Sequence, residues 1–194
     1  MISKKIHIIC ILLLSTLGLT AQDTMSTAQR CPKHFLNPSI HFGTLFGGQL
    51  NRGGFDYKSG FGAYITMDGA KNERLQIGIG AGIERLPREW FFPVYLQLIS
   101  SLKNQTTGGY FILQAGYSFS ILEAYNHYHS VNDRGGYMIS PGWGYKIQLD
   151  KKAQLYFAAQ IKQQGLSIDF TSDASEHYTE QFTYTLLMLR VGLR

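Results

Sequence analysis

The sequence predicts an all-β protein, an eight-stranded antiparallel up-and-down transmembrane β-barrel. Three observations predict it: a period-2 alternation in eight segments, an export signal at the start, and no later apolar run long enough for a membrane helix. The alternation is plain in residues 73–84, where Ile77 and Ile79 alternate with Gly78 and Gly80. This period indicates strands whose two faces meet different surroundings.

The first 21 residues read as a secretory signal peptide. Lys4 and Lys5 form its basic start, an apolar run covers 6–14, and Leu19-Thr20-Ala21 fits a small-residue cleavage site. The apolar run is shorter than the roughly 20 residues that a spanning helix needs. We therefore expect three parts: signal peptide 1–21, a short periplasmic lead-in 22–38, and the barrel 39–194. Cys10 leaves with the signal, so Cys31 has no intrachain partner.

The eight strands follow from the runs of alternation and the turn residues between them. Short connections are expected near 68–72, 103–107 and 150–152, and long ones at 122–135 and 164–179. Outer-membrane barrels have short periplasmic turns and longer external loops, so this asymmetry predicts a periplasmic N-terminus. The expected strands are about 39–50, 55–67, 73–84, 91–102, 109–121, 136–149, 153–163 and 187–193. Pro93 is expected to mark a strand rim because proline donates no ladder hydrogen bond.

The direction of the apolar face separates a membrane barrel from a soluble one. A soluble lipocalin-like barrel would turn its apolar face inward, around a ligand. Eight strands leave an interior that side chains just fill, whereas the apolar face carries bulky residues in nearly every strand. We therefore expect the apolar face to meet lipid and the glycine-rich face to line the lumen. Trp90, Phe91 and Tyr137 lie near expected strand ends and predict an aromatic girdle.

These features resemble a family. The features are Thr20-Ala21-Gln22 at the end of the signal, the glycine-alternating strands and the ending Arg190-Val191-Gly192-Leu193. With them the chain resembles small outer-membrane β-barrel proteins of Bacteroidota, of the OmpA/OmpX-like eight-stranded architecture. The resemblance covers the whole mature chain. It implies an outer-membrane location, and a role either as a surface barrel or as a barrel accessory to protein secretion.

Five charged residues are expected to face the lumen: Lys58, Glu84, Lys146, Lys162 and Arg190. Strand direction places Lys58, Glu84 and Lys162 in the outer half and the other two in the periplasmic half. Buried charges need partners, so the first interpretation is a salt-bridged plug. The alternative is a narrow polar conduit, for which eight strands leave little room.

The sequence offers little catalytic or ligand-binding chemistry, so an enzyme, a metal site and a cofactor are not expected. His127 and His129 lack the tight ligand spacing of a zinc site. Glu123, His129 and Ser130 are the set that a lipid A-modifying enzyme would use, but no nucleophile-elbow motif surrounds them. The formal net charge of +5 is spread without a nucleic-acid-binding motif, so no nucleic acid is expected.

The predicted function is that of a non-enzymatic outer-membrane barrel whose two long loops, 122–135 and 164–179, contact a partner outside. The loops contain Tyr125, Tyr128 and Tyr178 among polar residues, a mixture that suits adaptable recognition. The expected partners are outer-membrane lipid and a surface or envelope protein. The alternatives are an accessory barrel of a protein-secretion or envelope complex, a lipid A-modifying enzyme and a narrow pore.

Overall fold

The computed structural model describes residues 36–51, 54–70, 74–87, 89–102, 107–122, 130–150, 153–171 and 177–194. The expected signal peptide, Cys31 and nearly all of the lead-in lie outside these ranges. Within them, none of the helices has both the length and the apolar character needed to cross a bilayer.

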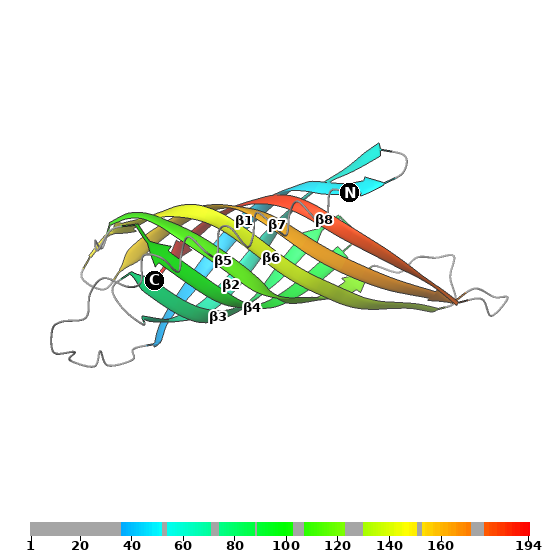
Figure 1. Ribbon diagram of the computed structural model, residues 1–194, viewed down its shortest axis with the longest axis horizontal. Coiled ribbons are helices and arrows are strands. Elements are labelled where there is room, and N and C mark those ends of the chain that lie inside the picture. The colour runs from blue at the N-terminus through cyan, green and yellow to red at the C-terminus, as the bar shows by residue number, and fades with distance from the viewer. Residues whose placement is uncertain are drawn as a thin grey trace, which may run out of the picture. The chain divides into compact units, whose positions relative to one another are not determined.

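Eight antiparallel strands close into one barrel, so the predicted fold class is confirmed (Figure 1). Each strand pairs with its neighbours in the chain, and β1 pairs with β8 to complete the ring. This is the up-and-down order that short connections impose. The strands are β1 (Leu36–Asn51), β2 (Gly54–Ala70), β3 (Leu75–Leu86), β4 (Glu89–Ser101), β5 (Gly108–Leu122), β6 (Ser130–Gln148), β7 (Gln154–Thr171) and β8 (His177–Leu193).

The apolar face of every strand points out of the barrel, as the sequence predicted. In β4, Leu96 is 63% exposed, whereas its neighbours Tyr95 and Gln97 are each 2% exposed. An outer surface of this kind is stable in lipid, and in water it would be a very large exposed apolar patch. The belt includes Phe42, Ile65, Ile79, Leu96, Leu113, Trp143, Ile161 and Leu189.

Two details of β4 correct the sequence predictions. Pro93 does not mark a rim: it lies within β4, and the β3–β4 pairs on either side of it are Ala81 with Val94 and Glu84 with Phe91. The ladder to β3 lapses at Pro93 because proline has no N–H to donate, while the pair with Ser118 on β5 is kept. Phe91 does not belong to an outer girdle either, since it is fully buried in the lumen.

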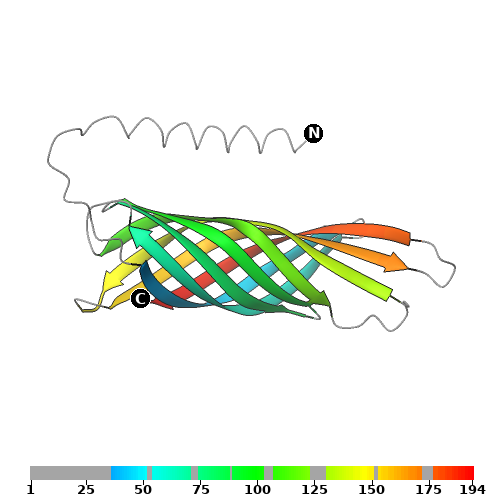
Figure 2. The same cartoon turned by 90° about the horizontal axis from the view of Figure 1, so that it is seen from below.

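The two long connections were predicted wrongly, because half of 122–135 and most of 164–179 is strand. β6 begins at Ser130, and β7 and β8 stay paired as far as Thr171 and His177 (Figure 2). The alternation inverts there, because the outward residues become polar while inward ones such as Leu166, Ile168 and Tyr184 are apolar, and backbone pairing continues. Tyr178 therefore lies in β8, opposite Phe170, and not in a loop. Residues 123–129, which hold Tyr125 and Tyr128, and residues 172–176 lie outside the described ranges.

A pair of glycines marks the point where β1 leaves β8. Gly47 and Gly48 have φ values of +154° and +156°, which side chains rarely allow. A Cβ at Gly48 would collide with the carbonyl oxygen of Asp56. The β1–β8 pairing ends at Gly48 and Thr185. Beyond it, the β1–β2 hairpin and the ends of β7 and β8 diverge in Figure 1.

Candidate functional site: the lumen and the outer end

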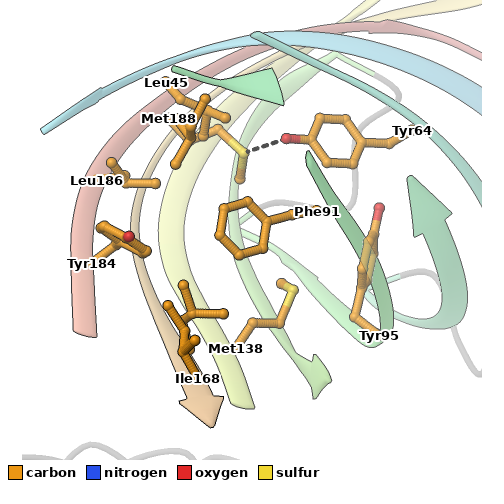
Figure 3. Packing of buried hydrophobic residues seen from close by; sticks show 11 residues of the cluster. Leu45, Tyr64, Phe91, Tyr95, Met138, Ile168, Tyr184, Leu186 and Met188 are labelled. Carbon is orange, nitrogen blue, oxygen red and sulfur yellow. Dashed lines mark hydrogen bonds between the residues drawn. The ribbon is translucent and has the colours of Figure 1, made fainter. Parts of the chain in front are cut away.

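Apolar side chains fill the half of the lumen that the sequence predicts to lie toward the cell exterior, which we call the outer half; the opposite half is called the periplasmic half. Phe91, from β4, points to the middle of the barrel, between Tyr184 and Leu186 on one wall and Tyr64 and Tyr95 on the other (Figure 3). The Tyr64 hydroxyl oxygen lies 3.3 Å from Met188 Sδ. This apolar plug was missed because the inward face was judged by its glycines. The signal was present in Leu45, Leu86, Leu186 and Met188, which occupy inward positions. The plug consists of Leu45, Tyr64, Leu86, Phe91, Tyr95, Met138, Leu166, Ile168, Tyr184, Leu186 and Met188.

Two ion pairs lie among these apolar residues. Lys162 and Glu84 form a pair whose side chains are 0% and 1% exposed, and the Tyr64 hydroxyl donates to Glu84 Oε1 at 2.9 Å. A charge buried this deeply depends on its partner. The pair joins β3 to β7 across the lumen.

The second pair lies nearer the outer rim. Lys58 Nζ is 2.7 Å from Glu89 Oε1, and the Tyr184 hydroxyl donates to the same oxygen at 2.9 Å. Glu89 was missed because it precedes the stretch expected to form a strand. The structure thus places Lys58, Glu84 and Lys162 in the outer half but divides them between two pairs.

In the periplasmic half of the lumen the described polar side chains form hydrogen bonds and not ion pairs. Gln114 Nε2 donates to Gln97 Oε1 at 2.6 Å, and Gln97 Nε2 donates to Asp68 Oδ1 at 3.0 Å. Lys146 Nζ donates to Ser101 Oγ at 2.8 Å. These contacts cross-link β2, β4, β5 and β6 and fill the lumen with bonded side chains.

Arg190 differs from the other predicted lumen charges. It is 5% exposed, and its guanidinium carbon lies 4.5 Å from the centre of the Tyr64 ring. None of its three side-chain nitrogens has a hydrogen-bond partner among the described residues. The predicted plug of salt bridges therefore describes the outer half better than the part around Arg190.

The cavity beside Arg190 has a volume of about 10 Å³, which is room for roughly one water molecule. Ser39, His41, Asp68, Gln97 and Gln160 contribute polar atoms to its wall. Together with the apolar plug, its small size counts against a continuous water-filled path through the described part of the lumen. Among the residues that the structure describes, no three His, Cys, Asp or Glu side chains gather as a metal site would require.

The outer end of the barrel carries two surfaces of different chemistry. On β7 and β8 the outward pair Ile161 and Leu187 is followed by Gln163 and Thr185, and from there to Asp169 and Thr179 the outward residues are polar apart from Gly165. Thr179 Oγ1 donates to Asp169 Oδ1 at 2.7 Å on this face. We call the outward-facing residues Gln163, Ser167, Asp169, Thr179, Gln181, Thr183 and Thr185 the polar extension.

The β1–β2 hairpin, by contrast, stays apolar to its tip. Leu50 is 83% exposed, and Phe55 and Tyr57 are 59% and 61% exposed. Gly48 pairs with Thr185, the first polar outward residue of β8. Leu50 and Phe55, which lie beyond Gly48 in the hairpin, are still apolar, so the apolar belt extends further along β1 and β2 than along β8.

A closed eight-stranded barrel with an apolar outside and a filled lumen has the architecture of small outer-membrane proteins. No protein-family model matches the chain, and no curated protein matches it in sequence.

Three solved outer-membrane proteins share the fold. The outer membrane protein OprG from Pseudomonas aeruginosa has a TM-score of 0.55 at 10% identity, with 82% of this chain and 95% of OprG covered. Outer membrane protein AlkL, determined in lipid bilayers, has the same score and identity, covering 89% and 95%. Neisserial surface protein A has a TM-score of 0.51 at 10% identity, covering 80% and 95%. At this identity the likeness shows the fold alone.

Proposed function

We propose that this chain is a non-enzymatic outer-membrane barrel that binds a surface or envelope protein at its outer end, through the polar extension of β7 and β8. The observation that carries the proposal is the change of the outward face from Ile161 and Leu187 to Gln163 and Thr185. Lipid requires apolar residues on that face, and water or a protein partner accommodates polar ones.

The construction of the polar extension supports binding. Its residues stand on paired strands from Gln163 to Thr171, and paired strands hold side chains in fixed positions better than loops do. Fixed polar groups lose little conformational entropy on binding. The residues of 123–129 and 172–176, with Tyr125 and Tyr128, are proposed to complete the surface.

The location is part of the same proposal. The apolar belt fits a bilayer, the three comparison structures are outer-membrane proteins, and the first 21 residues read as an export signal. The short connections then lie in the periplasm with the N-terminus, and the polar extension lies outside. The resemblance to barrels of Bacteroidota stays a prediction.

The filled lumen counts against the conduit interpretation, because the apolar plug and the Lys162–Glu84 pair occupy its outer half. A lipid A-modifying enzyme stays an alternative, and so does an accessory role in a secretion or envelope complex, which would act through the periplasmic connections. The accessory role and the proposed role place the partner at opposite ends of the barrel, so one experiment separates them.

The experiment is photo-crosslinking in living cells. A photoreactive amino acid at Gln181, in the polar extension, is expected to give a discrete covalent adduct with a surface or envelope protein. Leu189, within the belt, is the matched control on the same strand and should give no protein adduct. Adducts confined to a probe at Asp150, at the opposite end, would overturn the proposal in favour of the accessory role.

A further inference from the structure

Arg190 is a permanent charge in the lumen without a charge partner. Its residue is 5% exposed, and Nε, Nη1 and Nη2 all lack hydrogen bonds among the described residues. Arginine does not lose its proton in proteins, so burial cannot be relieved by neutralisation. The Tyr64 ring, 4.5 Å away, stabilises one face of the guanidinium but offers nothing to its N–H groups at the edge.

The unpaired groups around Arg190 include further donors. Gln160 uses its Oε1 to accept from Ser140 Oγ at 2.8 Å, while its Nε2 is buried without a partner. Gln160 and Arg190 line the same cavity. The Tyr95 hydroxyl lies close enough to the guanidinium to accept from one of its five N–H groups, which leaves the others without an acceptor. Unpaired donors that converge on one small cavity require an acceptor.

The charges of the lumen show which acceptor fits. The described cations that face the lumen are Lys58, Lys146, Lys162 and Arg190, and the Arg194 guanidinium lies at the periplasmic rim, where it donates to Gln76 Oε1 and to the Tyr156 hydroxyl. The described side-chain carboxylates of the lumen are Glu84, Glu89 and Asp68. Two cations are paired, Lys162 with Glu84 and Lys58 with Glu89. Asp68 is then the described lumen carboxylate left for Lys146, Arg190 and Arg194. It lines the cavity and accepts from Gln97, but it forms no ion pair with Arg190. Positive charge is left over in this half of the lumen.

We propose that the lumen holds one small monovalent anion, of the size of chloride, bound to Arg190 and Gln160. Such an ion offsets positive charge in this half of the lumen and supplies an acceptor to the guanidinium edge. The cavity of about 10 Å³ admits a particle of about the size of water, which excludes sulfate and phosphate. The ion would join Arg190 on β8 to Gln160 on β7 in the periplasmic half, as the Lys162–Glu84 pair joins β7 to β3 in the outer half.

Two measurements on the protein extracted from the outer membrane test the proposal. Bromide replaces chloride in crystals and gives an anomalous signal, which we expect beside Arg190. An ion that binds the folded state alone also raises the unfolding temperature with its concentration. The midpoint should therefore be higher in sodium bromide than in sodium gluconate of equal ionic strength.

Matched variants separate this site from general salt effects. Arg190→Met removes the charge and keeps the length of the side chain, so its midpoint should no longer depend on bromide. Arg85→Met removes an outward guanidinium that stacks on Trp90 at 4.5 Å, and the bromide dependence should persist. Equal midpoints of the natural protein in both salts would overturn the proposal. So would an anomalous map without a peak at Arg190, which would mean that the cavity holds a water molecule. A peak at Arg190 without a bromide-dependent midpoint would mean an adventitious ion only. The crystal experiment decides even if Arg190→Met fails to fold.

Discussion

Replacement of Lys162 by methionine should destabilise the barrel strongly, although methionine has nearly the same length and is apolar. Glu84 would stay buried at 1% exposure with one hydrogen bond, from the Tyr64 hydroxyl at 2.9 Å. Removing one partner of a buried ion pair costs about 3–5 kcal/mol, because the remaining charge has no compensation. We expect a loss in this range in the free energy of unfolding.

The double variant Lys162→Met with Glu84→Gln separates the lost partner from the lost packing. Replacing a whole buried pair with uncharged groups is often close to neutral, and glutamine can still accept from Tyr64. We therefore expect the double variant to recover most of the stability lost in the single one. The coupling energy from the double-mutant cycle should be clearly favourable to the pair.

The assay is reversible urea unfolding from lipid vesicles, followed by the fluorescence of Trp90 and Trp143. Lys58→Met is the matched control: its side chain is 14% exposed, so water compensates part of the loss and we expect about 1–2 kcal/mol. A loss below about 1 kcal/mol for Lys162→Met would refute the buried pair, since a buried carboxylate left without its partner costs several times that. So would a double variant no more stable than the single one.

Three further predictions concern the belt, the lumen and conduction. Leu189→Arg, in the belt, should cost about 2–4 kcal/mol in the same urea assay, and Thr183→Arg, in the polar extension, about 0–1 kcal/mol; equal costs would contradict the boundary between them. Gly80→Ala should cost about 1–3 kcal/mol by overpacking, because its Cβ would collide with the Tyr95 ring and lie 2.8 Å from Thr66 Cγ2. Gly109→Ala, whose first contact is the flexible end of Leu102 at 3.0 Å, should cost less. In planar bilayers the protein should show no steady conductance, and an open channel that Lys58→Gln alters would contradict the filled lumen.

The membrane part of the fold was predictable because lipid and lumen impose opposite requirements on alternate residues. Leu96 and Gln97 illustrate this, and so do Ile161 and Lys162, since each neighbour meets a different environment. The same reasoning failed beyond Thr185, where the pattern inverts: the outward face becomes polar and the inward face carries residues such as Leu166 and Ile168. The paired ends of β7 and β8 were therefore taken for a loop, and Tyr178 with them.

The lumen was predictable as a set of charges but not as a set of partners. Strand parity placed Lys58, Glu84 and Lys162 inward, whereas the pairing of Lys58 with Glu89 depends on the register between strands, which the sequence does not state. The apolar plug was missed because inward leucines such as Leu45 look unremarkable among glycines. The unpaired guanidinium of Arg190 becomes visible only when every neighbouring group has its partner assigned.

The most direct test of the account is electrophoresis of the isolated outer-membrane fraction, with boiled and unboiled samples side by side. A closed barrel held by continuous strand pairing resists detergent until it is heated, so the account predicts a protein in this fraction whose mobility changes on boiling. A soluble periplasmic protein with the same mobility in both lanes would contradict it, because the apolar belt would then have no lipid to meet.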